Sequence, residues 1–253
     1  MLKRTFVVLI VLLAIFLAFP ERTAPDANAW GFYGHKRINR MACYTLPPEM
    51  FGFFKRHIDF ISDHAVDPDA RRYAVEGEAQ RHYIDIDHYE KAGEDVFDVM
   101  PKKWDDAITK YTEDTLQAYG IVPWHIEVMF GDAHVPLHTT ENYNGQFTDQ
   151  YGIHAFWESR IPELSAENYD HLVGRAQIID RPLDAAWIAV KDSHSHLDSV
   201  FGIEKRLSIE FPEDRKFVFE DRGRSGMRTY SREFTMAYEA AMGGMVESRM
   251  NSS

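Results

Sequence analysis

The sequence contains few of the features that stabilise small exported proteins covalently or divide large ones into domains. Cys43 is the single cysteine in 253 residues, so no disulfide can form within the chain. Internal repeats, low-complexity tracts and Gly/Ser/Pro-rich linkers are absent, which predicts one mature domain. There is also no His-Asp dipeptide, which argues against metallophosphohydrolases that bind metal through adjacent His-Asp pairs. Bound metal ions are an alternative source of stability.

Basic residues are scarce relative to acidic ones. The chain has 28 Lys and Arg against 40 Asp and Glu, a formal net charge of −12. Such a protein gains nothing from long-range attraction to nucleic acid or anionic lipid. A phosphate substrate would therefore need metal ions to supply positive charge. The hydrophobic content of 45%, with 13% aromatic residues, is ample for a buried core and excludes disorder.

The N-terminal apolar run is too short to span a membrane. Phe6–Phe19 is uninterrupted, but a transmembrane helix needs about 20 residues. Lys3 and Arg4 precede the run, and the small residues Ala27–Ala29 follow it, as at a secretory cleavage site. We predict that residues 1–29 are a signal peptide, cut between Ala29 and Trp30, and that the protein is periplasmic or secreted. An uncleaved membrane anchor is the alternative. Cleavage removes three basic and two acidic side chains, leaving a net charge near −13.

Hydrophobic residues recur at helical spacing through most of the chain, which predicts an all-α fold. The alternation in Lys216–Glu220 is typical of a strand, but the stretch is too brief to found a sheet. Residues 30–253 are predicted to form one compact multi-helix domain. The predicted helices are a short one starting near His35 and closed by Pro47-Pro48, then Glu49–His64, Pro101–Tyr119, Val122–Phe130, Ile153–Arg160, Leu183–Leu207 and Arg228–Arg249.

The most informative stretch is Gly131–Glu158, because it concentrates side chains that bind metal. His138, His154 and Glu158 provide two imidazoles and one carboxylate, and the last two share a helix face because they are four residues apart. This is the ligand set of a catalytic zinc that keeps one position open. The alternative is a histidine-rich stretch that solvates a surface or caps a helix.

A second set of candidate ligands precedes this stretch. Cleavage before Trp30 would free an α-amino nitrogen that can chelate a metal with the carbonyl oxygen of the same residue, and His35 can complete that site. Asp67 and His82 lie far enough apart for a loop to bring them to one metal. We interpret Asp69, by contrast, as a residue that caps a turn or orients a metal ligand, which is the more frequent role of an aspartate in such a position. The alternative for Trp30 is an ordinary tryptophan near a signal cut.

Together these motifs resemble the superfamily of zinc-dependent phospholipases C and single-strand-specific nucleases. The resemblance covers Trp30–Glu158, about half the chain. It implies a compact all-α fold and up to three zinc ions. The implied ligands are Trp30 and His35 for one zinc, Asp67 and His82 for a second that Asp132 bridges to the first, and His138, His154 and Glu158 for the third.

The resemblance also implies a function. It predicts phosphodiester hydrolysis, in which a zinc-activated water attacks phosphorus and Asp67 both ligates zinc and orients that water. The implied substrates are a phospholipid head group or single-stranded nucleic acid. Aromatic residues such as Phe32 and Tyr143 suit either one, because they can stack a base or line an acyl pocket. No stable protein partner is implied.

One position departs from the family pattern. The family has a histidine four residues before the bridging aspartate, and Val128 occupies that position here. His125 is seven residues from Asp132, a rise of about 10.5 Å along a helix, which is too far to share its zinc. We therefore expect the site of Asp67, His82 and Asp132 to be weakened. The alternative function is an exported zinc-binding relative with impaired or no catalysis.

Overall fold

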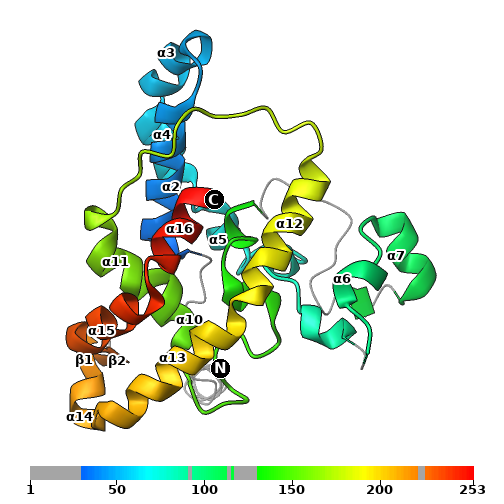
Figure 1. Cartoon of the computed structure of the whole chain (residues 1–253). Coiled ribbons are helices and arrows are strands. Elements are labelled where there is room, and N and C mark those ends of the chain that lie inside the picture. Colours follow the sequence, from blue (N-terminus) through cyan, green and yellow to red (C-terminus); the bar gives the residue numbers. More distant parts are fainter. Residues whose placement is uncertain (1–29, 91–92, 113–114, 117–129, 222–225) are drawn as a thin grey trace, which may run out of the picture.

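A computed structural model describes residues 30–253, except 91–92, 113–114, 117–129 and 222–225. The described chain is mostly helical with one two-stranded sheet, so the predicted all-α class is confirmed (Figure 1). No helix in the described ranges is long and apolar enough to cross a membrane. The predicted signal peptide, residues 1–29, lies outside them.

The elements follow one another in the order of the chain. In the first half they are α2 Gly31–Thr45, α3 Pro48–Arg56, α4 Ile58–His64, α5 Asp67–Arg71, the single turns η1 Ala79–Arg81 and η2 Ile86–Tyr89, α6 Val96–Val99 and α7 Trp104–Lys110. In the second half they are η3 Pro136–Thr139, α10 Ile153–Ala155, the π-helical turn η4 Phe156–Arg160, α11 Ile161–Ser165, η5 Ala166–Asn168, α12 Pro182–Ser195, α13 Leu197–Glu210, α14 Glu213–Lys216, β1 Phe217–Asp221, β2 Gly226–Tyr230, α15 Arg232–Met242 and α16 Met245–Ser252.

Several boundaries differ from the prediction. Helix α2 begins at Gly31 rather than near His35, and the stretch predicted as Glu49–His64 is two helices that meet at His57. The stretch predicted as Leu183–Leu207 likewise breaks at His196. Backbone hydrogen bonds leave the α-helical pattern at both histidines, and hydrophobic spacing alone does not reveal such a break. Helix α7 is shorter than predicted, and nearly all of the predicted helix Val122–Phe130 lies outside the described residues.

The strand that follows residue 225 corrects the prediction of a helix from Arg228. Strand β2 pairs antiparallel with β1, with Phe217 opposite Tyr230. Pairing is favoured because Tyr230 is buried and stacks on Phe156, with ring centroids 4.0 Å apart. The helix starts only at Arg232, where the Ser231 hydroxyl accepts a hydrogen bond from the backbone N–H of Phe234.

The described chain has two apolar cores. The larger one contains Trp30, whose ring lies 5.2 Å from that of Trp157, and the aromatic residues around Phe156. The smaller one gathers residues of η2, α6, α7 and α12. In Figure 1 the segment with η3 lies between α2 and α16 on one side and α12 on the other. This segment contributes Val135 and Leu137 to the larger core and Ala133 to the smaller one. It therefore links the two cores.

Candidate metal centre

The segment of residues 132–140 is buried along its whole length. A buried stretch without a long helix or strand needs other partners for its peptide groups. The carbonyl oxygen of His138 accepts a hydrogen bond from the backbone N–H of Ile84 (2.8 Å), and that of Thr139 lies 3.0 Å from Nδ1 of His194. With its backbone paired and its side chains in two cores, this segment is a rigid support for Asp132 and His138.

The first candidate group consists of His138, His154 and Glu158. Their ligand atoms all lie within 4.8 Å of one another, and they are the only His, Cys, Asp or Glu set in the described ranges to do so. Oε2 of Glu158 is 3.3 Å from Nε2 of His138 and 3.1 Å from Nε2 of His154. Two atoms bound to one tetrahedral zinc at about 2.0–2.1 Å lie about 3.3–3.4 Å apart. These spacings therefore fit one metal ion.

Local structure explains how these three side chains meet. His154 belongs to α10 and Glu158 to the π-helical turn η4 that continues it, and π-helical turns are frequent at functional sites. The His154 ring lies parallel to that of His138, with centroids 5.0 Å apart. Gly31 permits the close approach of α2 to η4: its φ is +46°, and a Cβ there would lie 2.3 Å from Oγ of Ser159.

Electrostatics at this group favour metal ligation. Burial lowers the pKa of His138, so its imidazole is held neutral, as metal binding requires. Burial raises the pKa of Glu158, but the neighbouring His154 and His138 outweigh this effect and leave the pKa below its usual value. The carboxylate is therefore ionised although it is completely buried.

The second candidate group places two aspartates between two histidines. Nε2 of His35 lies 3.4 Å from Oδ2 of Asp69 and 3.5 Å from Oδ1 of Asp132. Nδ1 of His82 lies 3.4 Å from Oδ1 of Asp69 and 2.8 Å from Oδ2 of Asp132. Each carboxylate thus presents one oxygen to each imidazole, which is an arrangement that can bridge two metal ions.

The two aspartates differ in their acidity. Burial raises the pKa of Asp69 to about 6, although His35 and His82 counteract it. For Asp132, burial has the same effect, but the two imidazoles outweigh it and hold the pKa well below the usual range. Burial lowers the pKa of His35, yet the carboxylates of Asp132 and Asp69 raise it overall. Metal binding at this group must therefore displace protons.

Asp67 does not lie where the sequence predicted. Its carboxylate is half exposed and pairs with Nδ1 of His64 at 2.7 Å, whereas Asp69 exposes only 1% of its surface and lies beside His35 and His82. Both aspartates belong to α5, and two residues correspond to about 200° around a helix, so they point in nearly opposite directions. Asp69 takes the position that we assigned to Asp67. The Asp-Pro-Asp spacing was the only signal for it.

Trp30 joins the second group through its side chain. The indole is completely buried, and its Nε1 donates to the carbonyl oxygen of Gly131 (3.0 Å), next to Asp132, and to the Ser253 hydroxyl (3.1 Å). Gly131 packs closely on His35, since a Cβ there would lie 3.3 Å from Cε1 of that ring. The Trp30 side chain thus lies against the residue before Asp132, which packs on His35; the predicted ligation through the α-amino nitrogen and carbonyl oxygen of Trp30 stays a prediction.

We expect export to yield a mature protein that begins at Trp30, because the small residues Ala27–Ala29 before it match a secretory cleavage site. Intact mass and N-terminal sequencing of the exported protein measure this directly. A mature chain that starts at another residue would remove the α-amino ligand and contradict the predicted Trp30–His35 site.

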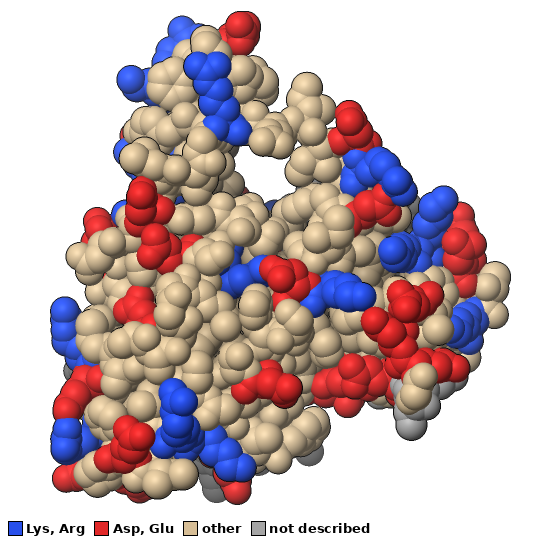
Figure 2. All heavy atoms as spheres, viewed as in Figure 1, with Lys and Arg blue, Asp and Glu red and all other residues tan. Residues whose placement is uncertain are grey.

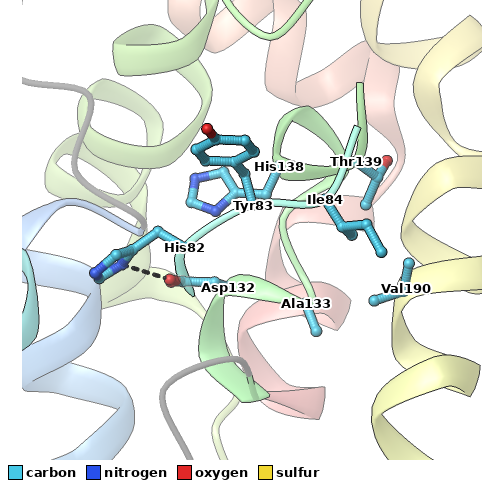
Figure 3. Close-up of a pocket in the computed structure, with 8 residues that line it drawn as sticks. All are labelled: His82, Tyr83, Ile84, Asp132, Ala133, His138, Thr139 and Val190. Atoms are coloured by element: carbon cyan, nitrogen blue, oxygen red, sulfur yellow. Dashed lines mark hydrogen bonds and ion pairs between the residues drawn. The ribbon is translucent and has the colours of Figure 1, made fainter. Parts of the chain in front are cut away.

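A small cavity of about 10 Å³ lies between the two groups. Figure 3 shows His82 and Asp132 on one side of it and Ala133 and Val190 on another, with His138 behind Tyr83. This volume has room for about one water-sized species. Val128 and His125, on which the predicted weakening depends, lie outside the described residues, so that expectation stays a prediction.

Comparison with family models, with curated proteins and with solved structures finds no match to this chain. The resemblance to phospholipases C and nucleases therefore stays a prediction, and the chemistry proposed below is argued from the residues themselves.

Proposed function

We propose that this protein is an exported zinc-dependent phosphodiester hydrolase. The observation that supports it best is the pair of buried His/carboxylate groups supported by one segment, residues 132–140. His138, His154 and Glu158 form the compact group, and His35, His82, Asp69 and Asp132 form the more open one.

The donor set fits bound zinc. Several polar atoms of these residues are buried and have no hydrogen-bond partner in the described chain, among them Nε2 of His35, Oδ1 of Asp132 and Oε1 of Glu158. An unsatisfied buried group costs about 1–3 kcal/mol, and more if it is charged. Imidazole nitrogen and carboxylate oxygen are ligands that zinc accepts, and no cysteine is needed. Bound metal would satisfy these groups.

Zinc in such a site activates water and neutralises charge on phosphoryl oxygens. The chain's own contribution is to hold the ligands in place and to keep their charge. Asp132 and Glu158 remain ionised in spite of burial, because imidazoles flank both. The protein has a net charge of −12, so a phosphodiester would be repelled by its overall field. Recognition of the substrate must therefore be local.

Exposed aromatic residues offer such local recognition, and one of them, Tyr143, lies beside the compact group. The Tyr143 ring meets His154 edge-on at 5.6 Å, and Tyr143, Phe147 and Tyr151 expose 45%, 71% and 63% of their surfaces. Described acidic and basic side chains are interspersed over the face in Figure 2, without a continuous basic stripe. These features suit stacking or apolar contact better than electrostatic attraction. We accordingly propose a phospholipid head group or single-stranded nucleic acid as substrate.

The test measures metal and turnover on the same sample. We expect purified mature protein to contain more than one zinc by elemental analysis and to hydrolyse bis(p-nitrophenyl) phosphate. A chelator should abolish turnover and lower Tm, and added zinc should restore both, because ligand binding stabilises the folded state. Zinc without turnover would indicate the zinc-binding relative instead. Protein that binds no zinc would refute the proposal.

A further inference from the structure

Arg249 is a buried cation with an unusual set of partners. It belongs to α16 near the end of the chain and exposes 4% of its surface. Its Nε donates to the carbonyl oxygen of His134 (2.9 Å), Nη2 donates to the Ser193 hydroxyl (2.5 Å), and Nη1 pairs with Asp192. Removing an arginine from water is costly, so a buried arginine is weak evidence for a role in stability alone.

Ser193 extends the same network to the neighbouring peptide. It is completely buried in α12, and its hydroxyl donates to the carbonyl oxygen of Ala133 (2.5 Å) while it accepts from Arg249. The carbonyl groups of the two residues directly after Asp132 are therefore held by two helices from the C-terminal part of the chain.

The peptide on the other side of Asp132 is also held. The carbonyl oxygen of Gly131 accepts from the Trp30 indole, which in turn contacts the Ser253 hydroxyl at the end of α16. The backbone on both sides of Asp132 is thus fixed, and this sets the position from which its carboxylate reaches His35 and His82. Metal ligands must hold their positions to about 0.5 Å.

We propose that Arg249 and Ser193 are positioning residues that set the Asp132 carboxylate for metal binding. This inference depends on the proposed function, because it assumes that the second group binds zinc. It gives the C-terminal third of the chain a specific role. Ser193 of α12 and Arg249 of α16, which we call the clamp, hold the peptide groups that follow Asp132.

The experiment compares Arg249→Met, Arg249→Lys and Ser193→Ala with the unmodified full-length mature protein. Zinc dissociation constants are measured by competition with a chromophoric chelator, and Glu158→Gln identifies which class of site belongs to the compact group. We expect Arg249→Met to weaken zinc at the Asp132 group about 10–100-fold, as losses of residues that orient ligands do. Zinc at His138, His154 and Glu158 should be retained. Arg249→Lys should recover part of the affinity.

Met242→Ala is the matched control for a general loss of stability, because Met242 is a buried apolar residue of α15 in the larger core and contributes no hydrogen bond to the clamp. It should lower Tm but leave both classes of zinc site unchanged. If Arg249→Met does not fold, Ser193→Ala, which removes two hydrogen bonds and no charge, carries the test with a smaller selective loss.

Two results would overturn the clamp. Either the variants bind zinc like the unmodified protein, or both classes of site weaken together and by similar factors, as a general loss of stability would cause. In these cases the proposed function stands. Absence of zinc from the unmodified protein would instead remove both proposals.

Discussion

Replacing Asp69 by asparagine is expected to remove zinc from the second group and to lower phosphodiesterase activity by about 100-fold or more, beyond the loss typical of residues that only orient a ligand. The carboxylate is buried, and its two oxygens lie 3.4 Å from His35 and 3.4 Å from His82. Asparagine keeps the shape but loses the charge and one acceptor oxygen. Elemental analysis and turnover of bis(p-nitrophenyl) phosphate on the same preparation measure both effects.

Asp67→Asn is the matched control, because it makes the same chemical change two residues away in α5. Asp67 is half exposed and contacts His64, so the loss of this pair should cost about 0–1 kcal/mol of stability. Zinc content and turnover should stay within about twofold of the unmodified protein, as is usual for a surface substitution. A reversed result, in which Asp67→Asn loses zinc and Asp69→Asn keeps it, would restore the assignment made from sequence.

Asp67 and Asp69 show which part of the site could not be predicted from the sequence. Ligands that are close in sequence on one continuous helical stretch could be predicted. His154 and Glu158 are four residues apart, and in the structure their ligand atoms are 3.1 Å apart. The choice between Asp67 and Asp69 instead depends on the rotation of α5 about its axis. In the structure α5 is rotated so that Asp69 faces His35 and His82, and these are contacts between separate segments that no local pattern encodes.

The fold, too, has features that follow from local sequence spacing and features that depend on contacts between separate segments. The all-α class and most helices could be predicted from hydrophobic periodicity, because burial of one helix face leaves a repeat in the sequence. The hairpin of β1 and β2 could not, since the register that places Phe217 opposite Tyr230 is a contact between separate segments. The clamp of Arg249 on the carbonyl oxygen of His134 also joins residues far apart in sequence, and an arginine that binds backbone carbonyls has no sequence signature.

The compact group gives the second large expected effect. Replacing Glu158 by glutamine should reduce the number of bound zinc ions by one and lower phosphodiesterase activity by about 100-fold or more, because it removes one of three protein ligands. Oε2 of Glu158 lies within 3.3 Å of both His138 and His154, and among the described residues no other carboxylate shares this compact group.

Glu167→Gln is the control for loss of a carboxylate from the surface. Glu167 pairs with Arg37 at 2.7 Å and is 72% exposed, so the substitution should leave zinc content unchanged. The zinc at Asp69 and Asp132 should survive Glu158→Gln, just as the zinc at His154 should survive Asp69→Asn. The double variant should then lose both classes of site. Unchanged zinc stoichiometry in Glu158→Gln would contradict the assignment of this group, whereas loss of all zinc in either single variant would mean that the two groups form one cooperative cluster.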